Sequence, residues 1–227
     1  MVYNSISFKL ICAQHHQKHT QLGDKDFTLV IDKSTLLQNF QLQLPTGYHR
    51  ESLGRLAHLK ENTLRDAAVL IGFVEREEGL QVILTKRAEH LRHHPGQISF
   101  PGGKYENDDH TLVNTALREA EEEIGIHQTH IQVFGQLPKL PTISQFNVTP
   151  FLAFVSPDHT TRIDQNEVAE VFEVPANHIL NPEKLYSTKF NLRKTSHRVF
   201  AIPYQRHFIW GMTAQIIESM QKHIISN

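Results

Sequence analysis

The chain has 227 residues, of which 39% are hydrophobic, 23 are basic and 24 are acidic. This length predicts one domain with an extension rather than two full domains, because a domain usually takes about 100–200 residues. The net charge of −1 excludes a global positive field that would attract nucleic acid or an anionic membrane. The single cysteine, Cys12, excludes an internal disulfide and a cysteine-based zinc site.

Residues 1–65 are predicted to form an N-terminal extension that is partly helical and packs on the main domain. Ser34 would cap a short helix that Pro45 would end. The apolar side chains of this helix are Leu36, Leu37, Phe40 and Leu44. A second amphipathic stretch runs from about Arg50 to Arg65.

The sequence carries no signal for a membrane or for export. No stretch approaches the ~18 apolar residues that a membrane helix needs. The first residues lack the basic start of a signal peptide, and Lys9 interrupts their short apolar run. We therefore expect a cytoplasmic protein whose partner is a small molecule rather than a nucleic acid or a membrane.

The main domain, residues 66–227, is predicted to begin with a β-hairpin. The apolar run 67–74 predicts a strand, EREEG at 75–79 predicts a turn, and 80–85 predicts the returning strand. A tight turn is expected at FPGG, residues 100–103.

Strands and helices alternate irregularly in the rest of the domain, which predicts an α/β (α+β) sandwich. The later elements are expected to be strands at 131–137, 148–156 and 198–203 and a helix at about 213–225. The apolar character of the final strands and helix favours a homodimer.

The segment 111–124 predicts a helix with an acidic end. Gly125 suits the left-handed position that closes a helix. Glu119, Glu122 and Glu123 stand at i, i+3 and i+4, so their carboxylates share one face. The apolar residues that recur at three- and four-residue steps are Val113, Ala116, Leu117, Ala120 and Ile124.

Two interpretations of this acidic cluster stay open from the residues alone. Like charges at this spacing repel, and carboxylates near a helix C-terminus oppose the helix dipole. A solvated surface helix tolerates both penalties. A hard divalent cation such as Mg²⁺ or Mn²⁺ would instead turn the repulsion into a set of oxygen ligands.

The segment from Gly103 to Ile126 resembles the Nudix box of the Nudix hydrolases, whose second half reads Arg-Glu-apolar-x-Glu-Glu-x-Gly-apolar. Residues 118–126 match this half without a mismatch. In the first half, the usual acid falls eight residues before the arginine, where this chain has His110. Asp109 stands one residue earlier, so the loop holds one extra residue.

The resemblance implies a Nudix α/β/α sandwich with a mixed sheet and a loop–helix–loop metal site. It implies that Glu119, Glu122 and Glu123 are catalytic residues that bind Mg²⁺ or Mn²⁺. It also implies that Arg118 is a catalytic residue, which orients a carboxylate. The backbone of Gly103 would lie close to the metal. The reaction would be metal-assisted hydrolysis of a nucleoside diphosphate derivative.

The run before the box, residues 84–103, is similar to the additional motif of the coenzyme A pyrophosphatase branch of this family. The matching residues include Arg87, Arg92, Gln97, Gly102 and Gly103, which the resemblance assigns to substrate binding. Ala88 replaces the commoner serine. The implied reaction splits coenzyme A into 3′,5′-ADP and 4′-phosphopantetheine, or its acylated form.

Arginine forks suit phosphate oxygens, but an ordinary surface charge cluster is the alternative for this basic segment. Two alternative functions also stay open. One is a Nudix pyrophosphatase acting on another substrate, such as ADP-ribose, a nucleoside diphosphate sugar, a dinucleotide or a nucleoside triphosphate. The other is a non-catalytic Nudix module that binds a ligand.

Glu167 and Glu170 are candidates for an additional acid, with a solvated strand edge or helix start as the alternative. The 16 histidines first suggest a histidine metal site. Most of them are scattered without ligand spacing, and only His90, His93 and His94 fall within residues 84–103. We therefore assign the metal chemistry to carboxylates.

Overall fold

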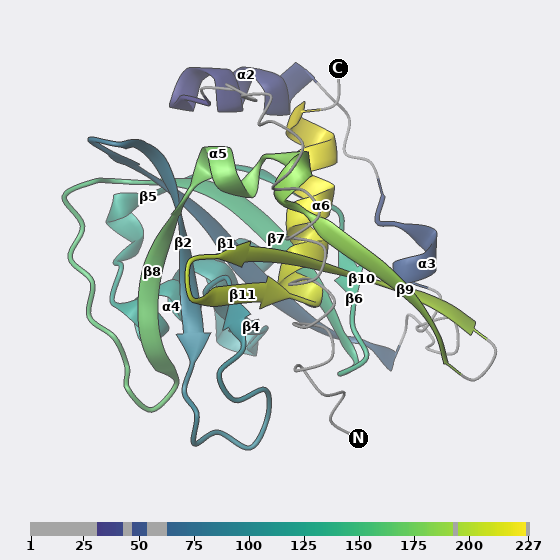
Figure 1. Cartoon of the computed structure of the whole chain (residues 1–227). Coiled ribbons are helices and arrows are strands. Elements are labelled where there is room, and N and C mark those ends of the chain that lie inside the picture. Colours follow the sequence, from purple (N-terminus) through teal and green to yellow (C-terminus); the bar gives the residue numbers. More distant parts are fainter. Residues whose placement is uncertain (1–30, 43–46, 54–62, 193–194, 226–227) are drawn as a thin grey trace. The chain divides into compact units, whose positions relative to one another are not determined.

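A mixed sheet of eight strands forms the centre of the part of the chain that the computed structural model describes, residues 31–42, 47–53, 63–192 and 195–225 (Figure 1). Its two central strands, β1 (Arg65–Arg76) and β7 (Phe146–Val155), run parallel to each other. The other strands are β2 (Gly79–Arg87), β3 (Ile98–Ser99), β4 (Gly102–Lys104), β5 (Ile131–Gln136), β6 (Leu140–Pro141) and β8 (Val168–Pro175).

The β1–β2 hairpin confirms the strand pair predicted at 67–85. The register pairs Arg76 with Gly79, so the turn is shorter than predicted and consists of Glu77 and Glu78. Most of β1 is an apolar run that is buried on both faces, as expected for a strand at the centre of a sheet that is covered on both sides.

Helices cover both faces of the sheet. α4 (Leu112–Ile124) packs on one face, where Ala116 and Ala120 contact a cluster that includes Ala68 and Phe151. α2 (Lys33–Leu42) and α6 (Met212–Ile225) cover the other face, where Phe40 meets the rings of Phe134 and His223 edge-on. The predicted α/β (α+β) sandwich with a mixed sheet is confirmed.

A second, three-stranded antiparallel sheet leads into α6. Its strands are β9 (Tyr186–Leu192), β10 (Thr195–Tyr204) and β11 (His207–Trp210). β10 contains the strand predicted at 198–203, and α6 confirms the predicted last helix. The short helical elements are α3 (Arg50–Leu53), α5 (Ala176–Ile179), η3 (Asn107–Asp109), η4 (Gln128–His130) and η5 (Pro182–Lys184).

Three local predictions were wrong. The residue that caps α2 is Asp32 rather than Ser34, because Asp32 Oδ1 accepts a hydrogen bond from the amide of Thr35 (2.7 Å). The amphipathic stretch predicted from about Arg50 to Arg65 contains the short helix Arg50–Leu53, but its last residue, Arg65, belongs to β1 instead. Pro45 and residues 54–62 lie outside the described residues.

The third correction concerns FPGG, predicted as a tight turn, whose last two residues enter strand β4. Gly102 pairs with Val69 and Gly103 pairs with Ala68 of β1. A Cβ atom on Gly102 would lie 2.3 Å from the carbonyl oxygen of Ala68. Only glycine fits this close approach between two backbones.

All described residues belong to one compact unit within Ile31–Asn227. Described parts of the predicted N-terminal extension pack on the domain. The amide of Ile31 donates to Asn177 Oδ1 (3.0 Å), and the hydroxyl of Tyr48 donates to the carbonyl oxygen of Pro138 (2.8 Å). The predicted boundary between residues 65 and 66 stays a prediction.

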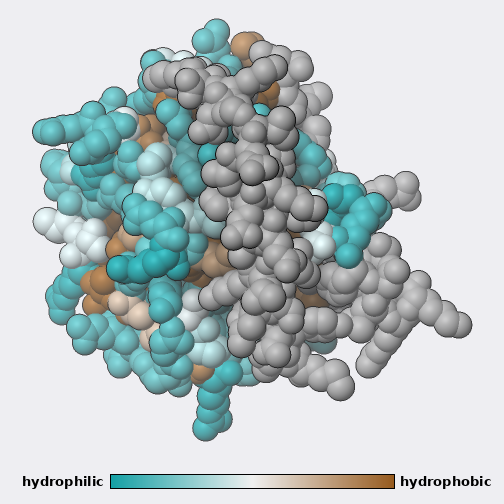
Figure 2. All heavy atoms as spheres, viewed as in Figure 1, coloured by the Kyte–Doolittle hydropathy of each residue, from teal (hydrophilic) through white to brown (hydrophobic). Residues whose placement is uncertain are grey.

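The described surface that faces the viewer in Figure 2 is mostly hydrophilic, with apolar residues in small, scattered groups. A search of the described helices found none with the length and apolar character that a membrane crossing requires.

Candidate active site

Helix α4 presents two of the predicted glutamates to the sheet. Thr111 caps its start, where the side-chain oxygen accepts a hydrogen bond from the amide of Asn114 (3.2 Å). Gly125 closes it with a φ of 74°, the left-handed conformation that glycine adopts without strain. Because the fully buried Ala116 and Ala120 face the sheet, Glu119 and Glu123 are carried to the same side.

Glu123 is a buried carboxylate with one backbone donor. It is 6% exposed, and the amide of Gly102 donates to its Oε2 (3.3 Å). Burial raises the pKa of Glu123 to about 8, and the negative charge of Glu119 adds to the effect. Ionising this group is therefore costly unless a positive charge is close.

Glu119 is the second carboxylate of this pair. Its side chain is 13% exposed, and its pKa is raised, mainly by burial. A Cβ atom on Gly103 would lie 2.3 Å from Glu119 Oε1, so the absence of a side chain at 103 leaves room for this carboxylate. As predicted, the backbone of Gly103 lies beside the acidic pair.

Arg118 links the acidic groups through its guanidinium. Nε and Nη2 donate to Oδ1 and Oδ2 of Asp109 (2.7 and 3.1 Å), and Nη2 also donates to the carbonyl oxygen of Lys104 (3.1 Å). Nη1 donates to Glu119 Oε1 (3.0 Å) and Glu122 Oε2 (2.8 Å). The guanidinium therefore fixes the orientation of Glu119, which is the geometry that the predicted role of Arg118 requires.

The extra residue in the loop is absorbed by His110. The η3 turn ends with Asp109, and His110 then takes a φ of 59° before Thr111 begins to cap α4. This left-handed residue returns the chain to the helix while leaving Asp109 5% exposed and aimed at Arg118. The Arg118 guanidinium holds the pKa of Asp109 well below its usual range.

The three predicted metal ligands are not gathered at one point. Glu122 has a side chain that is 60% exposed and pairs with Arg118, whereas Glu119 and Glu123 face the sheet. Within the described ranges, no group of three or more His, Cys, Asp or Glu side chains is preassembled as a metal site. The buried Glu119–Glu123 pair nevertheless fits a hard divalent cation, because its oxygen donors repel each other and the charges of Arg118 and Arg87 do not offset the rise in pKa of the two carboxyl groups.

The two candidate additional acids differ in position. The charge of Glu167 raises the pKa of both Glu119 and Glu123, so it lies near the pair. Its backbone carbonyl accepts from the amide of Ala88 (2.8 Å). Glu170, three residues later in β8, instead pairs with Arg206 (2.5 Å) and lies 3.3 Å from Nε2 of His207. The structure thus brings Glu167 to the pair and not Glu170.

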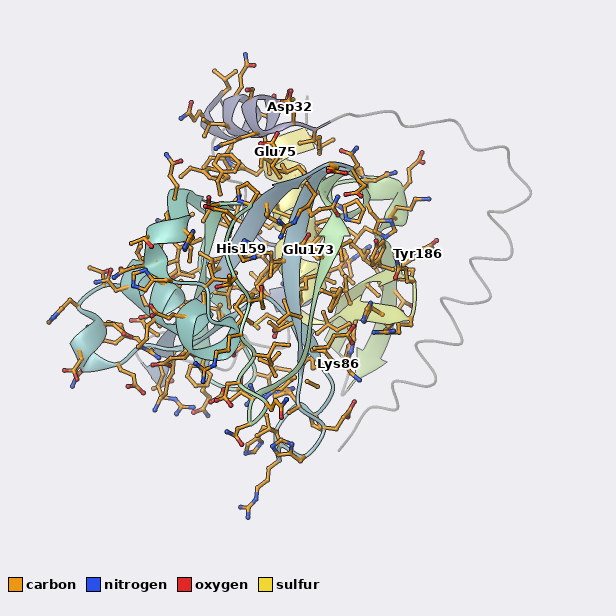
Figure 3. All side chains as sticks on the ribbon, turned by 90° about the vertical axis from the view of Figure 1, so that its left-hand side faces the viewer. Asp32, Glu75, Lys86, His159, Glu173 and Tyr186 are labelled. Atoms are coloured by element: carbon orange, nitrogen blue, oxygen red, sulfur yellow. The ribbon has the colours of Figure 1, made fainter. Side chains whose placement is uncertain are left out.

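A cavity of about 280 Å³ is lined by Gly102 and Gly103. Arg87 and Gln97 line it as well, so four of the five predicted substrate residues meet there. Arg92 does not line the cavity and is exposed. Figure 3 shows Lys86, the residue before Arg87, at the end of the sheet far from Glu75 and from Asp32.

Arg87 lies near the acidic pair as well as in the cavity. Its charge lowers the pKa of Glu123 against the larger effect of burial, and its Nε donates to the carbonyl oxygen of His93 (3.2 Å). The cavity therefore has a cationic side chain next to the buried carboxylates, as a site for a phosphorylated ligand requires.

Sequence reasoning missed several residues of this site. Phe146 and Val148 of β7 and Met212 and Thr213 of α6 form an apolar wall of the cavity. Thr115, fully buried, donates its hydroxyl to Asp109 Oδ2 (2.8 Å). The available signal for Thr115 was its position four residues before Glu119, on the acidic face of the predicted helix.

Comparisons with known proteins agree with this architecture. A family model described as the NUDIX domain matches residues 63–195. A protein of Yersinia pestis (strain Pestoides F), named "Uncharacterized Nudix hydrolase NudL", is 39% identical over 191 residues, which are 84% of this chain and 94% of that protein. The protein of the same name from Yersinia pseudotuberculosis serotype O:1b (strain IP 31758) matches equally.

Solved structures give a weaker likeness. A Nudix hydrolase from M. smegmatis, RenU, is 23% identical, with a TM-score of 0.43, over 49% of this chain and 70% of that one. The NUDIX domain of Shewanella oneidensis NrtR, complexed with ADP ribose, is 18% identical, with a TM-score of 0.42, over 55% of this chain and 83% of that one.

Proposed function

The chain belongs to the Nudix hydrolase family, and from this premise we propose that it hydrolyses the pyrophosphate bond of coenzyme A and its derivatives. The products would be 3′,5′-ADP and 4′-phosphopantetheine, or the acylated form of the latter. The family assignment makes the chain a pyrophosphatase. The choice of coenzyme A among the family's substrates is our own proposal.

One observation carries this choice. Arg87, Gln97, Gly102 and Gly103, assigned to substrate binding from the 84–103 motif, line one cavity. Its two glycines also contact the acidic pair, because the Gly102 amide donates to Glu123 and Gly103 lies against Glu119. Coenzyme A bears a 3′-phosphate besides its pyrophosphate, so it needs basic groups beyond the metal site. Arg87, His93 and Lys104 supply such groups at the cavity.

Nudix hydrolases generally use divalent metals such as Mg²⁺ or Mn²⁺, and Glu119, Glu122 and Glu123 are the residues proposed to hold them here. The bound cation would neutralise charge on the pyrophosphate and lower the pKa of a water molecule. Glu122 is joined to Glu119 through Nη1 of Arg118, which donates to both carboxylates.

The chain's own residues would divide the remaining work. Arg118, fixed by Asp109, holds Glu119 in one orientation. The amide of Gly102 holds Glu123. Glu167 is proposed as the additional acid that receives a proton from the attacking water, because its charge reaches Glu119 and Glu123.

Arg92 is proposed to contact a phosphate of the substrate from its exposed position next to the cavity-lining His93. We further propose that the protein works in the cytoplasm, without nucleic acid or membrane partners, and forms a homodimer. Size-exclusion chromatography with light scattering tests the dimer, which a monomeric mass at micromolar concentration would contradict.

A substrate panel tests the proposed specificity. Purified protein is incubated with Mg²⁺ or Mn²⁺ and with coenzyme A, acetyl-coenzyme A, ADP-ribose, a nucleoside diphosphate sugar, a dinucleotide tetraphosphate or a nucleoside triphosphate. Chromatography then identifies the products. We expect the highest kcat/KM for a coenzyme A compound, with 3′,5′-ADP as one product.

The panel also decides between the alternatives. A higher kcat/KM for ADP-ribose or another substrate, without turnover of coenzyme A, would contradict our choice and leave the pyrophosphatase chemistry intact. Binding of a substrate without turnover under either metal would favour the non-catalytic module. None of the three box glutamates is missing, which argues against that module.

A further inference from the structure

We infer that Thr115 is a positioning residue, whose buried hydroxyl fixes the carboxylate of Asp109 and, through Arg118, the carboxylate of Glu119. The inference rests on the proposed function only in taking Glu119 as a metal ligand. It assigns a role to a residue that is separated from the acidic pair by two side chains.

The hydroxyl of Thr115 is placed to donate to Asp109 in preference to the helix backbone. The side chain is 0% exposed and lies on the first turn of α4, next to the alanines that face the sheet. Its Oγ1 lies 2.8 Å from Asp109 Oδ2 and 3.4 Å from the carbonyl oxygen of Thr111. The shorter contact ends on a charged acceptor, and hydrogen bonds to charged groups are the stronger ones.

Asp109 needs such a donor because its loop is irregular. It follows η3 and precedes His110, whose left-handed φ of 59° absorbs the extra residue. Oδ2 of Asp109 accepts from the amide of Glu106 (2.9 Å), from Thr115 and from Nη2 of Arg118. The Glu106 amide and the Thr115 hydroxyl both donate to Oδ2 and so hold the Asp109 carboxylate in its orientation.

The orientation of Asp109 then determines where Arg118 points. Both oxygens of Asp109 are used by the guanidinium, through Nε (2.7 Å) and Nη2 (3.1 Å). This two-point contact leaves Nη1 directed at Glu119 (3.0 Å). A rotated Asp109 would lose one of the two contacts and release the guanidinium from the geometry that holds Glu119.

A buried threonine can also be merely structural, so the test needs a control. Thr149 of β7 is 2% exposed, and its Oγ1 has no hydrogen-bond partner among the described residues. Thr115→Val and Thr149→Val make the same change of one hydroxyl to one methyl group at two buried sites. Thr115→Ser keeps the hydroxyl.

The first measurement is the affinity for Mn²⁺ alone, from the free Mn²⁺ signal in electron paramagnetic resonance. Loss of a group that orients metal ligands typically costs about 10- to 100-fold in metal affinity or activity. We expect Thr115→Val to weaken Mn²⁺ binding by about 10-fold and to lower kcat more than it changes KM. Thr115→Ser and Thr149→Val should stay close to wild type.

The second measurement needs no metal. The hydrogen bond from Arg118 Nε to Asp109 should protect the Nε–H from exchange in the ¹H–¹⁵N spectrum. Thr115→Val should speed this exchange, whereas Thr149→Val should not. Wild-type Mn²⁺ affinity and wild-type Nε–H exchange in Thr115→Val would overturn the inference. An equal loss in Thr149→Val would also overturn it. A wild-type protein that binds no Mn²⁺ would contradict the proposed function, and the Nε–H exchange would still decide the role of Thr115.

Discussion

Helix α4 and the loop 88–97 both supply residues to the proposed active site, but they are held in very different ways. Of the α4 carboxylates, Glu119 and Glu122 accept from Arg118, and the buried Glu123 accepts from the Gly102 amide. In the loop, Arg92, His93 and His94 are exposed. The described hydrogen bonds of the loop are mainly backbone bonds, such as the one from the amide of Gly96 to the carbonyl of Arg87 (3.1 Å).

This difference corresponds to two proposed tasks of the site, metal binding by α4 and substrate binding by the loop. The protein itself fixes the orientation of Glu119 and Glu123, so these two carboxylates need little reorganisation when the metal and the substrate arrive. The basic groups of the loop gain most of their contacts from the substrate. Substitutions in α4 should therefore affect turnover, and substitutions in the loop should affect KM.

The largest expected effect is that of Glu123→Gln. This variant should fold but lose turnover by about 1,000-fold or more, because a metal ion supplies several kcal/mol of transition-state stabilisation. Glu122→Gln should also lose turnover by orders of magnitude. Steady-state kinetics with Mg²⁺ checks both, and the exposed Glu121→Gln on the same helix is the control. Wild-type turnover in either variant would remove that residue from the metal assignment.

The pH dependence of stability sharpens the comparison further. The pKa of Glu123 is raised from an ordinary value of 4.5 to about 8 in the folded protein. Its protonated form therefore stabilises the metal-free fold fully below pH 4.5, and this contribution is lost as the pH rises through 8. Relative to wild type, the free energy of unfolding of Glu123→Gln should therefore rise by a few kcal/mol between pH 5 and 9. Urea unfolding with a chelator present measures this difference. A constant difference across this range would contradict the buried state of the group.

Replacing a glycine by alanine, once beside the carboxylates of α4 and once in the loop 88–97, compares the two regions directly. Gly103→Ala places a methyl group against the Glu119 carboxylate and should lower kcat by about 100-fold, as loss of ligand orientation does. Gly96→Ala meets only the end of the Glu89 side chain at a φ of 66°, and should change KM by a few fold. Steady-state kinetics of both variants measures kcat and KM. An equal effect of the two variants on kcat would contradict the distinction between the two regions.

The smallest expected effects separate the two arginines of the loop motif. Arg87 lines the cavity and lies near Glu123, so Arg87→Ala should lower kcat/KM for coenzyme A by at least about 10-fold, the cost of one charge-assisted hydrogen bond. Arg92→Ala should cost less, because this side chain is exposed. 3′-Dephospho-coenzyme A, compared with coenzyme A in both variants, shows which arginine serves the 3′-phosphate. A larger loss for Arg92→Ala would reverse our ranking.

The sequence predicted the parts of the fold whose local pattern and final environment agree. β1, β2 and α4 have unbroken apolar patterns, and they form as predicted. β4 was mistaken for a turn because two glycines are poor strand formers, and its strand exists only through pairing with β1. β8 was not among the predicted strands, although a solvated strand edge was one alternative for Glu167 and Glu170, and its partner β2 is distant in the chain.

In the site, helix periodicity was enough to place Glu119 and Glu123 together. It could not show that Glu122 turns to Arg118, because that depends on the guanidinium position. The pairing of Asp109 with Arg118 depends on the backbone angle of His110, which no residue pattern gives. Glu167 and Glu170 looked equivalent in sequence, but Glu167 precedes β8 and Glu170 lies within it, so they have different neighbours.

The hydrogen bond from the Thr213 hydroxyl to the carbonyl oxygen of Ile98 (2.9 Å) spans 115 residues and has a consequence for biosynthesis. A ribosome adds about 5–20 residues per second, so the glutamates of α4 emerge well before Met212 and Thr213, which close the apolar wall of the cavity. A nascent chain, or a product of premature termination before β11, would hold the acidic half of the site without that wall. Substrate recognition is thus completed only when the last helix has been translated and docked.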